Sequence, residues 1–220
     1  MILGIDTSLG TAVAVIEADG IVRSEQVSVD PRGHAEVIGN LLVDALAVAA
    51  TTAADVTHVA AGMGPGPYTG LRVGIAAART FALGRGIPVV PVPSHDAAAL
   101  GILLADALLA DADPESATPR FAVVTDARRR EFAYSVYDGM DDDGLPIRVA
   151  GPALAPRDDV DSVVRALGAE PHIVTDIPGS MVALVAARAL AAGRSVATDD
   201  AIYLRAPDVT MPAGPKRVGT

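Results

Sequence analysis

The residues most suggestive of chemistry form a glycine-rich stretch, residues 62–74, with the sequence GMGPGPYTGLRVG. An apolar run at residues 59–61 precedes it and good helix formers follow at residues 75–83, so it lies at a predicted strand-to-helix crossing. Proteins of the α/β class often carry functional sites there. A phosphate-binding P-loop is not indicated, because the GxxxxGK[ST] spacing and its lysine are missing and Pro65 and Pro67 each lack an amide donor.

Other residue types that carry catalysis show no matching arrangement. Two histidines four residues apart on a helix would point at one metal ion, but the positions four residues after the histidines hold Ile38, Gly62, Ala99 and Asp176. His172 and Asp176 have a ligand-like spacing, and we expect them to fall across the end of a strand. The chain has no cysteine and no serine in a GxSxG context. The sequence therefore predicts neither a metal centre nor a covalent nucleophile.

The glycines of this stretch have a second property, which is their spacing. Gly66, Gly70 and Gly74 recur at every fourth residue, and from Gly70 onward they share a helical face with Ala77 and Phe81. A face without side chains lets another backbone approach closely. The opposite face of this predicted helix is also apolar, so we expect both faces to be covered. Two interpretations remain open: the glycines pack against the chain's own sheet, or they contact a partner helix.

The same stretch resembles the GPGSFTGLRIG signature of the TsaB (YeaZ) family, with Pro67 and Tyr68 in place of the serine and phenylalanine. Three further segments match in the family's order: residues 2–8 (ILGIDTS), 126–131 (DARRRE) and 202–205 (IYLR). The resemblance implies a two-lobed, actin-like (ASKHA, ribonuclease-H-like) α/β fold, in which each lobe has a mixed β-meander sheet with flanking helices. It also implies the non-catalytic partner in the synthesis of tRNA threonylcarbamoyladenosine (t6A).

The resemblance further implies particular partners. The chain would bind and activate a TsaD-like catalytic subunit, which installs threonylcarbamoyl on the adenosine adjacent to the tRNA anticodon. A TsaE-like ATPase would join the complex, and the chain alone would form a homodimer. Transfer RNA would be contacted only through the complex, and membranes not at all. No cofactor is implied for the chain itself, since ATP acts only in the wider complex.

The family's pattern also assigns site residues. It places the surface for self-association and for the catalytic partner on the helix predicted at residues 34–50 and on the helix that follows Gly70. The implied interface residues are His34, Glu36, Ile38, Leu41, Leu42, Ala45, Gly66, Thr69, Gly70, Arg72, Val73, Gly74, Ala77 and Phe81. In the superfamily the tip of the first hairpin faces nucleotide phosphate, which implies a vestigial nucleotide site of Asp6, Thr7, Ser8, Asp126 and Arg128. The same residue types also suit ordinary turns.

Composition limits the function further. With 220 residues, 50% of them hydrophobic, the chain can bury a full core, or two small ones, without cross-links. No apolar run reaches the length of a membrane span and no basic leader precedes an apolar segment, so we expect a cytoplasmic protein. The net charge of −10, with Lys216 as the only lysine, argues against RNA binding by the chain alone, because phosphate contacts need clustered cations.

Hydrophobic periodicity predicts two halves with the same order of elements. The first has strands at residues 2–6, 11–18 and 21–29 and a helix at 34–50; the second has strands at 121–125, 131–137 and 147–150. Helices at 158–167 and 181–192 follow, with a strand at 172–175 between them. The turn-rich residues 111–119 are the best linker. We therefore expect a first lobe at residues 1–110, with the dimerisation helices, and a smaller second lobe at 111–220, whose C-terminal tail can pack back on the first.

The second half lacks parts that an active actin-like ATPase needs. Residues 126–130, where a second phosphate hairpin would lie, contain three arginines and no glycine, and residues 176–180, where an adenosine loop would lie, contain one glycine. The three arginines either bind an anion or solvate a hairpin. An active ATPase or kinase that uses Asp6 with Mg-ATP is the alternative function, and this degenerate half distinguishes it from a catalytically silent subunit.

Overall fold

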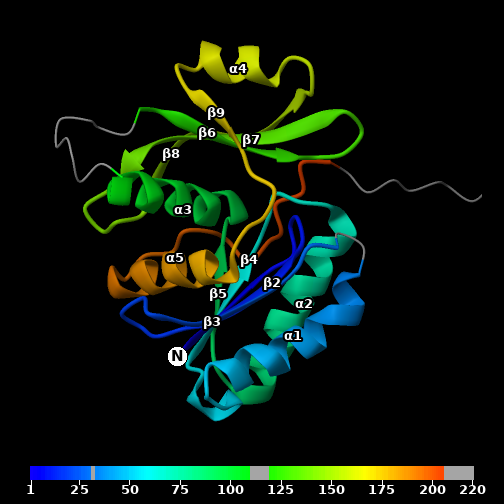
Figure 1. Ribbon diagram of the computed structural model, residues 1–220, viewed down its shortest axis with the longest axis vertical. Coiled ribbons are helices and arrows are strands. Elements are labelled where there is room, and N and C mark those ends of the chain that lie inside the picture. Colours follow the sequence, from blue (N-terminus) through cyan, green and yellow to red (C-terminus); the bar gives the residue numbers. More distant parts are fainter. Residues whose placement is uncertain (31–32, 110–118, 206–220) are drawn as a thin grey trace, which may run out of the picture.

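Two mixed β-sheets form the frame of the molecule (Figure 1). The computed structural model describes residues 1–30, 33–109 and 119–205. The first sheet has the strand order β3-β2-β1-β4-β5, made of β1 (Ile2–Asp6), β2 (Thr11–Ile16), β3 (Val22–Ser28), β4 (His58–Gly62) and β5 (Val89–Val92). The first three strands form an antiparallel meander, and β4 and β5 add in parallel to β1.

The second sheet repeats this pattern with one strand fewer. Its order is β8-β7-β6-β9, made of β6 (Phe121–Asp126), β7 (Glu131–Met140), β8 (Pro146–Pro156) and β9 (Glu170–Ile173). Again three strands form an antiparallel meander and the fourth lies parallel to the first. The predicted α/β class with two similar halves is thus confirmed.

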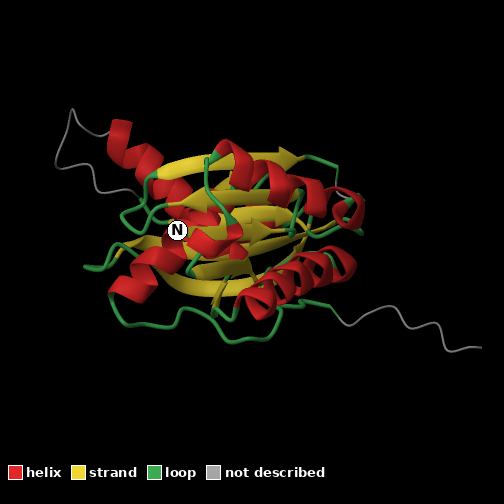
Figure 2. Cartoon of the chain, turned by 90° about the horizontal axis from the view of Figure 1, so that it is seen from below, coloured by secondary structure: helices red, strands yellow, loops and turns green. Residues whose placement is uncertain are grey.

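Helices cover both faces of the first sheet and also separate it from the second (Figures 1 and 2). On one face of the first sheet lie α1 (His34–Val48) and α2 (Tyr68–Arg85), and a short 3-10 helix, η1 (Ala53–Asp55), follows α1. Between the sheets lie α3 (Ser94–Leu109) and α5 (Gly179–Ala191), and α4 (Val160–Ala166) covers the outer face of the second sheet. The layers therefore alternate as helix, sheet, helix, sheet and helix.

Three apolar cores fill the spaces between these layers. The central core joins side chains of α3 and α5 to both sheets and includes the fully buried Tyr137 and Phe121, whose ring centroids are 5.7 Å apart. A second core lies under α1 and α2, and a smaller third one lies under α4. No helix in the described ranges is long and apolar enough to cross a membrane.

The boundary predicted between residues 110 and 111 separates the strands of the two sheets. It does not separate the helices that pack on them, because elements from after the boundary cover the first sheet. Helix α5 follows that boundary, yet it packs on β1 and β2 of the first sheet, where a Cβ at Gly4 would overlap the carbonyl of Gly179. The segment after α5 also returns to the first sheet, since the Ile202 amide donates to the Met63 carbonyl at 2.7 Å. Most of the predicted linker at 111–119 lies outside the described residues.

Candidate functional site

The turn between β1 and β2 holds Asp6 in a closed hydrogen-bond network. Its Oδ1 accepts from the amide of Ser8 at 2.8 Å and from the Ser8 hydroxyl, and its Oδ2 accepts from the Ser94 hydroxyl at 2.5 Å. The Ser94 hydroxyl in turn accepts from the amide of Gly64 at 3.0 Å. Asp6 is only 2% exposed, so it joins its turn to the glycine loop and to α3. In this conformation other groups of the chain bind its carboxylate, and the vestigial nucleotide role of Asp6 stays a prediction.

Burial also changes the acidity of Asp6. Desolvation raises the pKa of this carboxyl above its ordinary value, against the hydrogen bonds from Ser8 and Ser94, which lower it. The folded state therefore binds a proton more readily than the unfolded chain does. A stability contribution of this sign is complete below pH 3.8 and is lost as the pH rises through the folded-state pKa.

We therefore expect an Asp6→Asn variant to show a weaker decline of stability as the pH rises from about 4 to 7. The asparagine has nearly the same shape and carries no charge to bury, and its amide can donate to Ser94. Its overall cost at low pH should be about 1 kcal/mol. Urea unfolding of both proteins across that pH range measures the difference, and parallel stability curves would contradict the expectation.

The glycine face of α2 is filled by the chain itself. Thr7 lies against it, with its hydroxyl donating to the carbonyl of Gly70 at 2.8 Å. A Cβ at Gly74 would lie 2.9 Å from Thr7 Cγ2 and closer still to Oγ1, and one at Gly66 would lie 2.8 Å from Ser8 Cα. These glycines therefore pack against the β1–β2 turn of the same chain, which favours the first of the two interpretations, and their contact with a partner helix stays a prediction.

The other predicted interface residues divide by exposure. His34, Ile38 and Ala45 are buried under α1, and the ring of His34 makes a 2.8 Å hydrogen bond with the hydroxyl of Thr11. Ile38 and Ala45 belong to the apolar core under α1 and α2, and His34 lies at the edge of that core. The exposed or half-buried members are Glu36, Leu41, Leu42, Thr69, Arg72, Val73, Ala77 and Phe81. On the outer side of the same helices, Val43 and Leu83 are 66% and 84% exposed, and neither was among the predicted interface residues.

A side chain from the first sheet also occupies the N-terminus of α5. Its first amides, those of Gly179 and Ser180, donate to the two carboxylate oxygens of Glu25 at 2.9 Å each. Glu25 comes from β3, so a side chain of the chain itself satisfies the positive end of this helix. Like the network around Asp6, this contact is made entirely within the chain.

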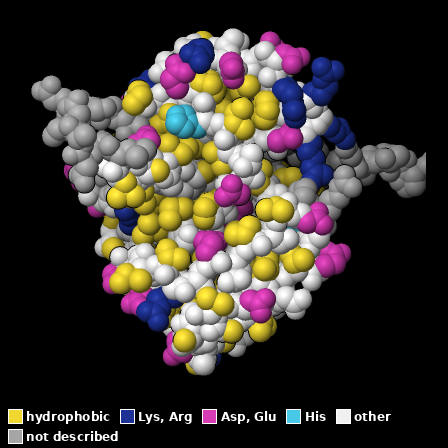
Figure 3. Space-filling model, viewed as in Figure 1, with side chains coloured by type: hydrophobic (Ala, Val, Ile, Leu, Met, Phe, Trp, Pro, Cys, Tyr) yellow, Lys and Arg dark blue, Asp and Glu magenta, His cyan; other side chains and the backbone are white. Residues whose placement is uncertain are grey.

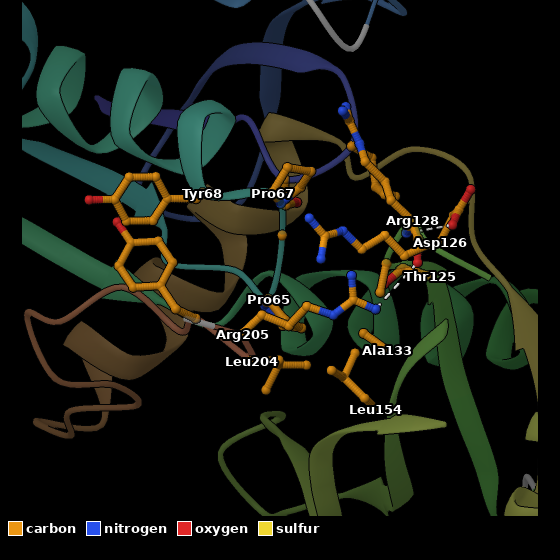
Figure 4. Close-up of a pocket in the computed structure, with 16 residues that line it drawn as sticks. Pro65, Pro67, Tyr68, Thr125, Asp126, Arg128, Ala133, Leu154, Leu204 and Arg205 are labelled. Atoms are coloured by element: carbon orange, nitrogen blue, oxygen red, sulfur yellow. Dashed lines mark hydrogen bonds between the residues drawn. The ribbon is translucent and has the colours of Figure 1, made fainter. Parts of the chain in front are cut away.

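A pocket of about 360 Å³ opens between the two sheets (Figure 4). It is bounded by the β1–β2 turn, the loop before α2, the β6–β7 turn and the segment 203–205. Of the predicted nucleotide residues, Ser8, Asp126 and Arg128 line it, whereas Asp6 and Thr7 are absent from its lining. The tertiary structure adds Arg129 and Arg205 to the same wall.

The β6–β7 turn presents its arginines from an unusual backbone. Arg128, Arg129 and Arg130 have φ angles of 62°, 51° and 62°, in the left-handed region, which costs roughly 1–2 kcal/mol for each residue other than glycine. Asp126 supports the turn, because its Oδ1 accepts from the Arg128 amide at 2.8 Å and from Arg157 Nη2 at 3.1 Å. Strained backbone of this kind concentrates at functional sites.

A buried polar network, which no sequence pattern predicted, joins the start of α3 to the second sheet. The two ring nitrogens of His95 lie 2.9 Å from the hydroxyls of Ser135 and Thr125. The carboxylate of the next residue, Asp96, accepts from the Tyr137 hydroxyl at 2.7 Å. Burial, and then the charge of nearby Arg148, lowers the pKa of His95 to about 3. His95 is therefore neutral and structural at neutral pH.

Metal ligands do not gather in the part of the chain that the structure describes, where no group of three or more histidine and acidic side chains is placed to hold an ion. His172 lies on β9, which ends at Ile173, so its spacing to Asp176 crosses the end of the strand as expected. The His172 ring instead packs against Phe121, with 5.5 Å between centroids.

Comparisons with known proteins agree with the fold. The family model described as "TsaD: tRNA N6-adenosine threonylcarbamoyltransferase" matches residues 22–174. An uncharacterized protein of Mycobacterium tuberculosis is 42% identical over 163 residues, covering 73% of this chain and 67% of that protein. The tRNA threonylcarbamoyladenosine biosynthesis protein TsaB of Escherichia coli is 30% identical over 144 residues, covering 66% of this chain and 57% of that protein.

Among solved structures, YeaZ from Pseudomonas aeruginosa superposes with a TM-score of 0.71 at 20% identity, over 92% of this chain and 99% of that one. At this identity the likeness concerns the fold, and it covers both sheets. Together with the sequence matches and the signature around Gly70, it identifies this chain as a member of the TsaB (YeaZ) family.

Proposed function

We propose that this chain is the non-catalytic partner subunit of the complex that makes t6A in tRNA, and that it binds and activates a TsaD-like catalytic subunit. The observation that carries the proposal is the family membership, together with the relative from Escherichia coli that is named for this biosynthesis. We further propose that a TsaE-like ATPase joins this complex, that the chain forms a homodimer when alone, and that it meets tRNA only through the complex.

Contacts within the chain occupy the positions where a nucleotide would be expected to bind, and this supports a non-catalytic role. The carboxylate of Asp6 is bound by Ser8 and Ser94, and Glu25 occupies the first amides of α5. Both contacts join distant segments of one chain, so opening either would expose buried polar groups. An active ATPase or kinase would need these positions free for metal and nucleotide.

The outer side of α1 and α2 supports the docking role. Along α1 the exposed residues follow helical spacing, with Glu36, Asn40, Val43 and Ala47 on one stripe. Along α2 a matching exposed stripe carries Thr69, Ala76, Thr80 and Leu83. The apolar members of these stripes are Val43, Ala47, Ala76 and Leu83. A partner can bury their surface, and apolar residues are typical of the centre of an interface.

We expect Val43→Asp to weaken binding of the TsaD-like subunit about tenfold or more, because a carboxylate would be buried at the interface. Val43 is 66% exposed in the chain alone. The melting temperature of the variant should therefore stay within about 2 °C of that of the natural chain. Isothermal titration with the purified catalytic subunit of the same organism measures the affinity.

Leu108→Asp is the matched control, because Leu108 is 81% exposed on α3, away from this surface. It should leave the affinity unchanged. If both variants bind as tightly as the natural chain, the partner docks on a surface other than the outer side of α1 and α2. If the natural chain fails to bind any TsaD-like subunit, the proposed function itself is overturned.

A further inference from the structure

The segment that follows α5 runs back along one side of α2, and we call residues 199–203 of it the strap. The carbonyl of Asp199 accepts a hydrogen bond from Arg79 Nη2 at 2.5 Å, in the middle of α2. The amide of Ile202 donates to the carbonyl of Met63 at 2.7 Å, in the loop that precedes α2. The strap therefore runs in the direction opposite to α2, from the middle of the helix to the loop before it.

Aromatic rings join the end of the strap to the first residue of α2. The ring centroids of Tyr203 and Tyr68 are 4.8 Å apart, with an interplanar angle of 41°. Arg72, one turn further along α2, places its guanidinium carbon 5.2 Å from the centroid of the Tyr68 ring and donates to the Tyr68 hydroxyl at 2.8 Å. Aromatic pairs and cation–π contacts stabilise a side-chain arrangement beyond the area that they bury. The three side chains thus form one cluster that fixes the strap to the first turn of α2.

The start of α2 needs such contacts, because a proline occupies its N-cap position. The ring of Pro67 carries no polar group that could accept from the first amides of the helix. The preceding loop is also shaped around the strap. Gly64 has a φ angle of 93°, and a Cβ there would lie 3.1 Å from the carbonyl oxygen of Ile202. The strap therefore supports both the first turn of α2 and the loop that leads into it.

The supported turn adjoins the surface proposed above for the TsaD-like subunit. The exposed stripe of α2 includes Thr69 and Ala76, and the side of the helix that carries Tyr68, Arg72 and Arg79 lies next to it. Figure 3 shows hydrophobic side chains scattered among uncharged atoms and a few acidic groups in the region of α1 and α2, at the lower right, whereas cationic side chains gather along the upper right edge. A surface with few charges binds through its shape, which depends on where α2 is held.

We propose that the strap positions this docking surface, with Tyr203 and Arg79 holding the first half of α2 in the place that a TsaD-like subunit recognises. The inference rests on the proposed function and assigns a role to residues outside α1. A surface that is already fixed in its binding conformation loses less conformational entropy when the partner docks. Tyr203 and Arg79 are thus positioning residues, which act on the partner through α2.

A Tyr203→Ala variant removes the ring that rests on Tyr68 and should weaken binding of the TsaD-like subunit about fivefold. Tyr203 is 39% exposed, so the variant should still fold. In the free chain, the Ile202 amide and the Leu71 amide, which donates to the Pro67 carbonyl at 3.0 Å, should exchange with solvent roughly fivefold faster than in the natural chain. Tyr203→Phe keeps the ring and should retain the natural affinity and exchange rates. Isothermal titration and hydrogen exchange followed by NMR measure the two effects.

Arg79→Met is an independent variant, because it removes the contact to Asp199 and leaves both tyrosine rings in place. It should weaken binding and speed exchange in the same way. Arg85→Met is the matched control. Arg85 ends the same helix and also donates to backbone carbonyls, but these belong to Ala53 and Ala54 of η1. Its loss should leave the affinity and the exchange rates at the start of α2 unchanged.

The combination of the two measurements separates positioning from direct contact. Weaker binding without faster exchange would show that Tyr203 itself touches the partner, and this would overturn the positioning role. Unchanged affinity in both Tyr203→Ala and Arg79→Met would also overturn it, as would an equal loss in Arg85→Met. If the natural chain binds no TsaD-like subunit, the proposed function fails, and the exchange rates of the free chain still decide whether the strap holds α2.

Discussion

A Gly74→Leu variant is expected to lose about 3 kcal/mol of folding stability, because the space beside Gly74 already holds Thr7. A Cβ there would lie 2.9 Å from Thr7 Cγ2 and closer to Oγ1, before the rest of the leucine is added. Thr7 cannot simply turn away, since its hydroxyl donates to the carbonyl of Gly70 at 2.8 Å and is buried. Overpacking of a dense core typically costs about 1–3 kcal/mol, and a lost buried hydrogen bond adds about 1 kcal/mol. For a chain of this size the melting temperature should fall by roughly 6–12 °C.

Gly84→Ala, in the same helix, is the matched control for this experiment. Nothing lies within 4 Å of a Cβ at Gly84, so the alanine should raise stability by up to about 1 kcal/mol through its higher helix propensity. Thermal and urea unfolding of the two variants measure both effects. A Gly74→Leu protein that keeps full stability but no longer binds its partner would restore the interpretation that this face contacts another chain.

Acid is expected to destabilise the fold through His95 by an amount on the order of 5 kcal/mol. The folded protein keeps this ring neutral, with a pKa of about 3, whereas the unfolded chain binds a proton near pH 6.5. The folded-state pKa is depressed, so the contribution is complete above pH 6.5 and is lost as the pH falls from there toward about 3. Each unit of difference corresponds to about 1.4 kcal/mol, which gives the size of the effect.

A His95→Gln variant isolates this contribution. Glutamine can bond to both Thr125 and Ser135 but does not titrate, so its stability should change less between pH 6.5 and 4 than that of the natural chain. The natural chain also contains Asp6 and Asp96, whose pKa values burial raises and whose contributions have the opposite sign, so the comparison must be between the two proteins at each pH. Replacing the less buried His58 by glutamine controls for histidine loss in general. Identical pH profiles for the natural and His95→Gln proteins would refute the role assigned to His95.

Local sequence patterns predicted much of this fold because they reflect local physics. Strands β1, β3, β6 and β9 lie within about two residues of their predicted bounds, since alternation and turn residues act over a few positions. The helix predicted at residues 34–50 ends at Val48, a difference typical of helix termini. The resemblance in the glycine-rich signature also predicted the family correctly.

The direction in which the glycines face could not be predicted. Spacing places Gly70 and Gly74 on one face of α2 whether that face meets Thr7 or a second chain, because helical periodicity contains no information about what lies opposite. The same limit applies to the vestigial nucleotide residues. Asp6 and Ser8 are both buried and share one hydrogen-bond network, yet only Ser8 is part of the pocket lining.

By itself, the sequence determined the order of strands and helices, the duplication of the meander, the family, and the absence of cysteine chemistry, because periodicity, composition and short motifs are local properties. Only the tertiary structure decided which polar groups are already bound by other parts of the chain and which remain accessible. Glu25 reaches the start of α5 from 154 residues away, His95 meets Ser135 from 40 residues away, and Arg205 crosses to a turn 77 residues earlier. Contacts over such separations depend on how the two sheets and the helices between them pack, and that packing sets the burial, the charge and the accessibility on which function depends.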